Sequence, residues 1–397
     1  MEKINQKINF NKMINDFLKK SFEKIDDLLV NNQLPNGHNG PYRDNETDVR
    51  KTAHLMVFYA NVIKSNLYSD STQIRNQLVN FKNSLINNSN YKGGAYFRCR
   101  IKPGKDEVNG VIGIAWVIEG LCASYEVLQD DEILVFLDKI VKSLKFNKLR
   151  SLWERPVNSK LDKTGVDETY NHQLWLGYAL VYYAKVSRTE LLEEVKSFFF
   201  NVDIHLNVRK SGLIVHGLKN KTTLKNKVKT ILKDFKIYVL SKKNKTTTAY
   251  KENGYHLFSV FAFARIKDLG FENLFSSSLK VQKAVSYASN KELYAFLTSN
   301  KEETDYYAIK TTSNLENNRY GFPYNVSGFE FVYINLIFNL KTASLGKKYF
   351  DKQLEVLGFT KQNNYFTNDT LTEDSINLFL RVYELSYCLN YKDVTLS

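Results

Sequence analysis

Hydrophobic residues along most of this chain recur at the i, i+3, i+4, i+7 spacing that places them on one side of an α-helix. Two kinds of helix are predicted, and they alternate. One kind is amphipathic and charged, over residues 5–32, 70–88, 131–146, 188–204, 271–287 and 347–359. The other kind is apolar on nearly every side, over residues 48–65, 108–128, 168–186, 252–267, 327–342 and 372–390. Because a helix that is apolar all round must be buried all round, the second kind predicts an inner layer that the first kind covers.

The connections between these helices differ in length in a regular way. A few residues lead from each inner helix to the next outer one, whereas most returns are long, over residues 89–107, 147–167, 205–251 and 288–326. If the helical hairpins close into a ring, the inner helices run parallel and the long links gather on one rim with the inner-helix N-termini. We therefore predict an all-α fold, an (α/α)6 toroid. A superhelical stack of helical repeats is the main rival, but it needs a fixed repeat length, and the inner helices are spaced unevenly.

Composition agrees with one continuous structure. Of the 397 residues, 43% are hydrophobic and 14% aromatic, and no Pro/Gly/Ser-rich linker divides the chain, which predicts a single domain over residues 1–397. Three scattered cysteines without CxxC spacing indicate neither a disulfide framework nor a zinc site. The N-terminus lacks the apolar segment of a signal peptide, and no run approaches the ~18 apolar residues that span a membrane. These features predict a soluble, cytoplasmic protein.

A basic segment stands apart from the rest of the chain. The net charge is +14, and residues 206–249 hold twelve Lys or Arg residues against one acid, Asp234. This pattern predicts an insertion that contacts an anionic ligand, a membrane surface or a protein partner, unless it is simply a solvated lysine-rich loop. Nucleic acid is not the expected partner, because few aromatic residues other than Phe235 and Tyr238 interleave with the lysines.

The N-terminal ends of the inner helices carry most of the chemistry. They read HNGPYRDNETDVRKTAH (38–54), KDEVNGVIGIAWVIE (105–119), VDETYNHQLW (166–175), AYKENGYHLF (249–258), RYGFPYNVSGFE (319–330) and FTNDTLTEDS (366–375). Most of these entrances place aromatic or imidazole groups beside carboxylates and amides, as carbohydrate sites do when rings stack on sugar faces and polar groups bind hydroxyls. Helix capping explains Asp44, Asp167 and Ser327 equally well, but not the rings beside them. No metal-ligand spacing or nucleotide-binding glycine motif is present, so we expect neither metal nor cofactor.

Spacing brings some of these side chains to one helix face. Glu46, Arg50 and His54 recur every fourth residue at the start of the first inner helix. Glu330 sits one turn inside an otherwise apolar helix, where an ionised carboxylate needs a partner or a ligand.

The stretches HNGPYRDNETDVRKTAH, NGVIGIAW, NHQLW, GYHLF and YGFPYNVSGFE resemble the six-hairpin, (α/α)6-toroid carbohydrate-active proteins. They are most similar to little-characterised proteins encoded in prokaryotic surface-glycan gene clusters. The wider group contains inverting glycosidases, unsaturated glucuronyl hydrolases, sugar epimerases and some polysaccharide lyases. The resemblance spans residues 36–342 in scattered motifs. It implies a sugar or oligosaccharide bound in the mouth of the toroid and supports the fold better than the reaction.

We expect an enzyme that hydrolyses a glycosidic bond of an oligosaccharide or polysaccharide, with one carboxylic acid at the leaving oxygen and one carboxylate that activates water. Asp167 is the first candidate, and Glu330 or Asp44 is the second, because different inner helices can face each other across one mouth at the ~6.5–9.5 Å of inverting enzymes. His172 and His256 complete the catalytic candidates. The expected substrate-binding residues are His38, Tyr42, Glu46, Arg50, His54, Trp116, Glu168, Asn171, Trp175, Tyr255, Tyr320, Tyr324 and Asn325.

Two alternatives to hydrolysis stay open. A lyase or C5-epimerase acting on a uronic acid would use His172 or His256 with a tyrosine to remove the proton next to a carboxylate, which Arg50 or Asn171 would neutralise. A non-catalytic glycan-binding protein of a surface-polysaccharide assembly system would use the same mouth without chemistry. The lack of an export signal favours glycan assembly or the processing of imported oligosaccharides over secretion.

Overall fold

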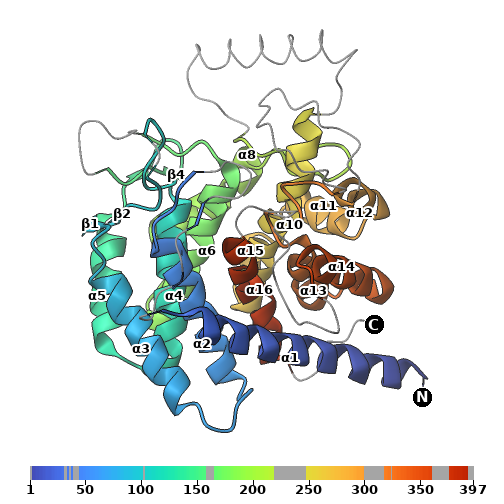
Figure 1. Ribbon diagram of the computed structural model, residues 1–397. Helices are drawn as coiled ribbons and strands as arrows, with labels where there is room; N and C mark the ends of the chain where they lie inside the picture. Colours follow the sequence, from blue (N-terminus) through green and yellow to red (C-terminus); the bar gives the residue numbers. More distant parts are fainter. Residues whose placement is uncertain are drawn as a thin grey trace.

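The computed structural model describes residues 2–30, 34, 37–38, 44–101, 103–157, 165–218, 247–298, 317–322, 324–359 and 375–391. These residues are mostly helical, which confirms the predicted all-α class (Figure 1). The elements, in chain order, are α1 (Glu2–Leu28), α2 (Val49–Lys64), α3 (Thr72–Ile86), β1 (Tyr91–Gly93), β2 (Tyr96–Phe97), α4 (Ile112–Leu128), α5 (Asp131–Ser143), β3 (Phe146–Asn147), β4 (Leu152–Trp153), α6 (Tyr170–Ser187), α7 (Glu193–Phe200), α8 (Val202–His205), α10 (Thr247–Asp268), η2 (Glu272–Leu274), α11 (Leu279–Ala288), α12 (Lys291–Leu297), α13 (Ser327–Phe338), α14 (Ala343–Val356), α15 (Ser375–Leu380), α16 (Val382–Ser386) and η3 (Tyr387–Asn390).

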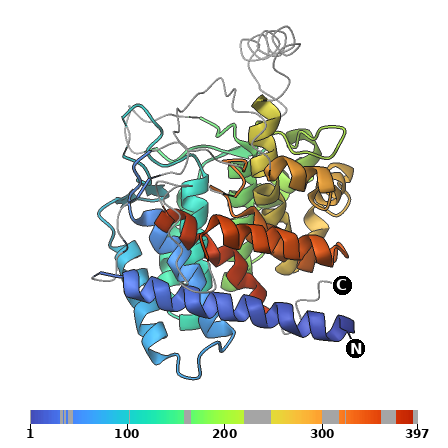
Figure 2. The same cartoon turned by 45° about the vertical axis from the view of Figure 1, so that its right-hand side comes forward.

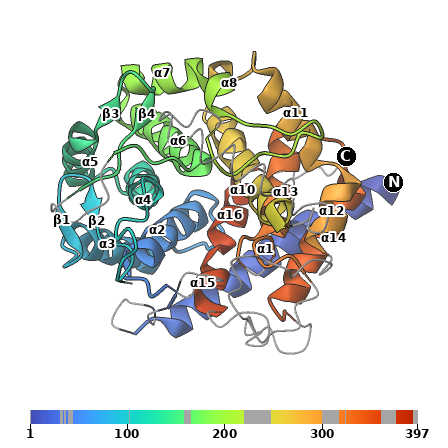
Figure 3. The ribbon, with the colours of Figure 1, turned by 90° about the horizontal axis from the view of Figure 1, so that it is seen from above.

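The most apolar helices contact one another in a closed order. Within the described residues, α2 packs on α4, α4 on α6, α6 on α10, α10 on α13 and α13 on α16, and α16 packs back on α2. The view from above in Figure 3 shows these helices around the centre of the molecule. Along α2 every residue except Lys64 is buried. A sequence that is apolar on all sides therefore occupies the place that buries all sides.

An amphipathic helix covers each inner helix from outside. The outer partners are α3 for α2, α5 for α4, α7 for α6, α11 for α10, α14 for α13 and α1 for α16. In α5 the buried residues recur at the helical period: Ile133, Phe136, Leu137, Ile140 and Val141. Figures 1 and 2 show α1 running along the base of the molecule and projecting beyond it. None of the described helices is both long enough and apolar enough to cross a membrane.

Short turns join several inner helices to the outer helices that follow. α4, α6 and α13 each end at a residue in the left-handed conformation, namely Gln129 (φ 53°), Arg188 (φ 56°) and Asn339 (φ 50°). A left-handed residue at this position ends the helix and reverses the chain within a few residues. The short inner-to-outer links of the sequence thus have a local structural cause.

Some predicted helices are interrupted. The inner helix expected over 372–390 consists of α15, α16 and η3, with the break at Arg381, and the outer helix expected over 188–204 is divided at Asn201 into α7 and α8. The one expected over 271–287 is η2 followed by α11. Hydrophobic periodicity cannot reveal such breaks, because a single turn of altered hydrogen bonding leaves the apolar side facing the core.

The long links and the inner-helix N-termini lie on the same rim. Isolated β-bridges pair Glu46 with Arg100 and Thr169 with Gly217, so each of these links holds the start of an inner helix. Residues 206–218, the described beginning of the basic segment, are part of this rim, with Leu213, Ile214 and Leu218 buried. The lysine-rich residues 219–246 lie outside the described residues.

The interior of the ring is filled below this rim. Glu119 Oε1 accepts hydrogen bonds from the hydroxyls of Tyr178 (2.9 Å) and Tyr387 (2.8 Å), and Arg265 donates to Tyr178 (3.2 Å) and Tyr333 (2.7 Å). Burial raises the pKa of Glu119 to about 7, against the opposing effect of its tyrosine partners and Arg265. Among the described residues, this network and the surrounding aromatic rings therefore fill the centre below the rim.

Candidate functional site

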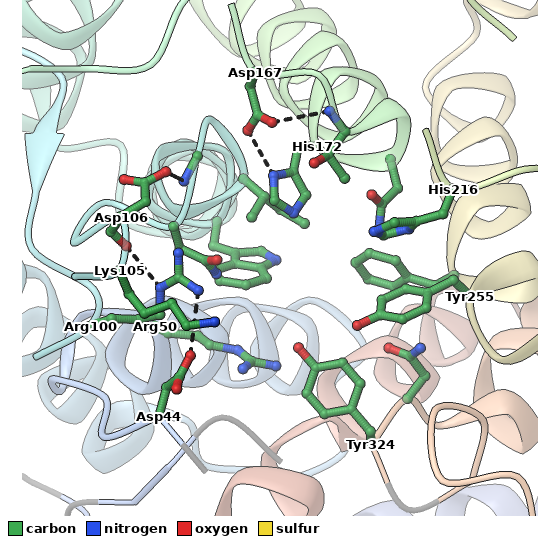
Figure 4. Close-up of a pocket in the computed structure, with 18 of the residues that line it drawn as sticks. Asp44, Arg50, Arg100, Lys105, Asp106, Asp167, His172, His216, Tyr255 and Tyr324 are labelled. Carbon is green, nitrogen blue, oxygen red and sulfur yellow. Dashed lines mark hydrogen bonds and ion pairs between the residues drawn. The ribbon is translucent and has the colours of Figure 1, made fainter. Parts of the chain in front are cut away.

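A cavity of about 280 Å³ opens at the N-terminal ends of the inner helices (Figure 4). It draws side chains from every inner helix or its approach, and also from the long links that lie over them. The residues that line it are Asp44, Arg50, Arg100, Lys105, Asp106, Asn109, Gly110, Ile112, Trp116, Arg155, Asp167, Thr169, Asn171, His172, His216, Tyr255, Phe258, Tyr324, Asn325 and Arg381.

Asp167 and His172 form the central polar pair of the cavity. Asp167 Oδ2 lies 2.7 Å from His172 Nδ1 and also accepts the backbone N–H of Val111 at 2.9 Å. Asp167 Oδ1 accepts from Arg155 Nη2 and from the backbone N–H of Thr169, each at 3.1 Å. The carboxylate side chain is 1% exposed, whereas the His172 side chain is 21% exposed. Asp167 therefore serves as an anchor, and His172 is the member of the pair that a ligand can reach.

The protonation of this pair follows from its surroundings. Burial alone would raise the pKa of Asp167, but the charges and hydrogen bonds of His172 and Arg155, with the N–H of Val111, hold it well below its usual range. An ionised Asp167 only accepts hydrogen bonds, so Nδ1 of His172 donates to it, and Nε2 is the ring nitrogen left to meet a ligand. A histidine fixed in this way by a carboxylate is suited to remove a proton from a ligand.

Gly110 makes room for the pair, and its replacement by alanine is expected to break the pair. A Cβ at this position would lie 1.9 Å from Asp167 Oδ2 and 2.6 Å from His172 Nδ1, and Gly110 has φ +65°. We expect Gly110→Ala to destabilise the fold by about 1–3 kcal/mol in urea unfolding, because the new Cβ and the Asp167 carboxylate cannot occupy the same place. Gly217→Ala is the matched control, because a Cβ there meets nothing within 4 Å. Wild-type stability of Gly110→Ala would contradict this geometry.

The loop before α4 is held by Asp106. Its carboxylate accepts the backbone N–H groups of Val108 (3.2 Å) and Gly110 (2.7 Å), and Arg155 Nε lies 3.2 Å from the same carboxylate. Arg155 thus joins Asp106 to Asp167 and ties this loop to the start of α6. The loop forms one wall of the cavity, and the Asp106 carboxylate fixes its conformation by accepting hydrogen bonds from the loop's own N–H groups.

His216 reaches the cavity from the segment that follows α8. Its backbone carbonyl accepts the N–H of Tyr170 (3.1 Å), and its ring packs on Tyr255 with centroids 4.9 Å apart. Burial, and then the positive charges of Lys251 and His172, lower the pKa of His216 well below its ordinary value. His216 is therefore a neutral imidazole. In Figure 4, His216 and Tyr255 lie on one side of the cavity and Arg100, Lys105 and Asp106 on the other.

Aromatic rings supply the apolar surface. Arg50 lies over the Trp116 ring, 4.6 Å from its centroid, and Tyr255 and Tyr324 have ring centroids 5.9 Å apart. Figure 4 shows the hydroxyls of Tyr255 and Tyr324 directed into the cavity. Flat rings beside polar groups are the combination that binds sugars.

Three buried polar atoms of the lining have no hydrogen-bond partner among the described residues. They are the Trp116 indole N–H, the Asn171 side-chain oxygen and Nδ1 of His216. An unsatisfied buried polar group costs about 1–3 kcal/mol, so such atoms gather where a ligand supplies the partner. The Trp116 N–H is a donor, the Asn171 oxygen is an acceptor, and a histidine ring nitrogen can be either, so the three atoms match hydroxyl groups, which both donate and accept.

Half of the residues predicted from the sequence line the cavity. They come from different inner-helix entrances, and the structure brings them together as Asp44, Arg50, Trp116, Asp167, Asn171, His172, Tyr255, Tyr324 and Asn325. Asn325 acts on the backbone, since its amide donates to the carbonyls of Gly254 (2.9 Å) and Tyr320 (2.6 Å).

The two other catalytic candidates lie outside the cavity lining. His256 is fully buried: its Nδ1 accepts the N–H of Ile214 (3.2 Å) and its Nε2 lies 3.1 Å from the carbonyl of Ala284. Burial lowers the pKa of His256 to about 3, so it stays neutral and holds the rim segment in place. Glu330 is also fully buried, and it forms an ion pair of 3.1 Å with Arg381, which itself lines the cavity.

The remaining predicted residues also pack around the cavity rather than in it. His54 stacks on Tyr383 with centroids 4.2 Å apart, and Trp175 stacks on Phe258 at 4.7 Å. Tyr42 lies outside the described residues. The rest of the set pairs with neighbours, Glu46 with Arg50, Glu168 with Arg150, Tyr320 with Tyr255, and His38 through its carbonyl with Asn377.

Several lining residues were missed from the sequence. Lys105, Asp106, Asn109 and Gly110 stand in the KDEVNG entrance, and an Asn-Gly pair after a potential Asx turn is a signal of a fixed loop. The other missed residues come from the long links and from the start of the last inner helix: Arg100, Arg155, His216 and Arg381. His216 and Arg155 carry no local signal, because only the pairing of distant rim segments brings them to the cavity.

Comparison with known proteins gives one relative along nearly the whole chain. Archaeal glycosylation protein Q of Haloferax volcanii is 24% identical over 373 residues, which cover 90% of this chain and 92% of the relative. No family model matches the chain.

Proposed function

We propose that this protein is a glycan-processing enzyme that moves a proton on a single sugar unit held in the cavity at the rim. A glycosylation protein that is similar over nine-tenths of the chain supports a role in glycan metabolism. The cavity volume of about 280 Å³ lies at the small end of ligand sites, which suits one sugar ring better than a polymer segment. The proposal includes the (α/α)6 toroid, which the closed order of inner helices and their one-to-one outer partners support.

The observation that carries the proposal is the Asp167–His172 pair facing a ligand-sized cavity beside a second, neutral imidazole, His216. His172 Nε2 removes a proton from a sugar carbon next to a carbonyl or carboxyl group, and the electron pair moves onto that group. Tyr255, on another side of the cavity beside the neutral His216, gives its hydroxyl proton to the same carbon, and exchange with water then restores both His172 and the tyrosine hydroxyl. The product is an epimer, and no other bond breaks.

The carboxylates of the lining are less suited to hydrolysis. A general acid needs a raised pKa, whereas the pKa of Asp167 is held low and its oxygens are occupied. Asp106 is occupied by its own loop and Arg155. Hydrolysis is nevertheless the second candidate, because Asp44 and Asp167 line one cavity from the approaches of two different inner helices.

One experiment separates these functions from simple binding. A panel of free sugars and methyl glycosides is incubated with the protein in D₂O and followed by NMR. Deuterium at a ring carbon with inversion supports the proposal, an unsaturated product indicates elimination, and new reducing ends indicate hydrolysis. Binding without any chemical change over the whole panel would replace the enzyme by a glycan-binding protein.

A further inference from the structure

The cations of the cavity are not equivalent, and the difference points to the kind of sugar that binds. Arg155 donates to the carbonyl of Val166 (2.8 Å) and pairs with the carboxylates of Asp167 and Asp106. Arg381 donates to the Tyr324 carbonyl and to Asn325 Oδ1 (3.1 Å), and it pairs with two buried glutamates. These two guanidinium groups hold the protein together and have little left for a ligand.

Lys105 and Arg100 remain available. Lys105 is exposed and lines the cavity, and no ion pair or hydrogen bond joins it to another of the described residues. Arg100 donates through Nε to the carbonyl of Asp106 (2.9 Å) and forms a long ion pair with Asp44, with 3.7 Å between Nη1 and Oδ2, so its outer nitrogens can still turn to a closer anionic partner. Both residues belong to the approach to α4, and Figure 4 shows them on the same side of the cavity.

The fixed loop explains why this pair of cations is presented to a ligand. The carboxylate of Asp106 accepts hydrogen bonds from the N–H groups of Val108 and Gly110 and pairs with Arg155. It forms no ion pair with the adjacent Lys105 among the described residues. The Trp116 N–H, buried and without a described partner, adds a further donor to the lining. Donors that lack protein acceptors in a cavity of this size match an anionic group on the sugar.

We propose that Lys105 and Arg100 form a carboxylate subsite and that the substrate is a hexuronic acid or its glycoside. This inference rests on the proposed proton transfer and deepens it. The carboxylate is also the electron sink: when the proton leaves the adjacent carbon for His172, the electron pair moves onto the carboxylate oxygens, and the two cations stabilise the second negative charge. The proton returns to the same carbon, and the carboxylate is restored.

The test measures binding, so that it does not depend on turnover. Methyl hexuronides of the gluco, galacto and manno series are compared with the matching methyl hexosides by calorimetry. At least one hexuronide is expected to bind wild-type protein about 10- to 100-fold more tightly than its neutral counterpart, the worth of a charge-assisted hydrogen bond. Lys105→Gln should remove most of that preference, Lys105→Arg should keep it, and neutral sugars should bind all variants alike. Lys348→Gln, an exposed lysine on α14 outside the lining, is the control.

Three results would overturn the subsite. They are equal affinity for acids and neutral sugars, a preference that survives Lys105→Gln, and tighter binding of a hexose 6-phosphate than of any hexuronide. The proposed function fails separately: hexuronide binding that depends on Lys105, without deuterium exchange, leaves the subsite and removes the chemistry. Deuterium exchange on a neutral sugar alone would keep the proposed chemistry and remove the carboxylate subsite.

Discussion

His172→Gln is expected to lower the rate of proton exchange on the sugar by about 10²–10⁴-fold while ligand binding changes little. Glutamine keeps a polar side chain near Asp167 but has no nitrogen basic enough to take a proton from a carbon. The loss should appear in kcat rather than in KM, because the role that we propose for His172 is on the reacting carbon. Deuterium incorporation followed by NMR gives the rate, and calorimetry gives the affinity.

A second histidine supplies the control for this experiment. His205 is buried and stacks on Phe198 with ring centroids 5.7 Å apart, outside the cavity lining. His205→Gln should leave exchange unchanged, and Asp167→Asn should slow it because an amide no longer fixes the His172 tautomer. If His172→Gln retained full activity while Asp44→Asn lost it, the reaction would be carboxylate chemistry.

Arg381→Met is expected to destabilise the protein by about 3–5 kcal/mol, the largest stability effect that we expect of a single change. Arg381 Nη2 lies 3.1 Å from Glu330 and 2.5 Å from Glu384, and both glutamate side chains are 0% exposed. Removing the arginine leaves two carboxyl groups in the core without their only described cation. Urea unfolding measures the change, and adding Glu330→Gln should recover part of it.

The cost of Arg381→Met should depend on pH. Burial, and then the neighbouring Glu384, raise the pKa of Glu330 well above its ordinary value, and burial also raises the pKa of Glu384. The native state therefore binds more protons than the unfolded state above pH ~4.3, so stability falls as pH rises. Without Arg381, which lowers both pKa values, the fall should be steeper and the variant weaker at pH 8 than at pH 5.

A surface pair provides the comparison. Arg98 lies 2.8 Å from Glu107, but these side chains are 36% and 37% exposed. Arg98→Met should cost less than about 1 kcal/mol at either pH, since water screens such pairs. Equal effects of Arg98→Met and Arg381→Met would show that burial does not strengthen the Arg381 cluster.

Helical periodicity was enough to find the inner helices. The segments expected over 48–65 and 108–128 became Val49–Lys64 and Ile112–Leu128, because burial on all sides leaves a sequence with few polar residues. The alternation of short and long links also predicted which ends of the helices share a rim. These features are local or regular, so a single sequence carries them.

The cavity could be predicted only in part. Asp167 and His172 were both predicted as catalytic candidates from one helix entrance, VDETYNHQLW, although not as a hydrogen-bonded pair. His216 and Arg155 reach the cavity because distant segments pair, as Thr169 does with Gly217, and no local pattern reveals such pairing. His256 and Glu330 looked equally chemical in the sequence, but whether a polar side chain meets the cavity or a backbone carbonyl depends on helix rotation, which the sequence does not specify.

The pairing of α1 with α16 has a consequence for how the protein reaches its working state. These two helices contact each other, although nearly the whole chain lies between them in the sequence. Contacts between such distant segments have the highest entropy of loop closure and form late in folding. Arg381, at the start of α16, lines the cavity and anchors Tyr324 and Asn325. We therefore expect the cavity to be completed late in folding, when α16 packs against α1 and α2, so that incompletely folded chains bind a ligand poorly.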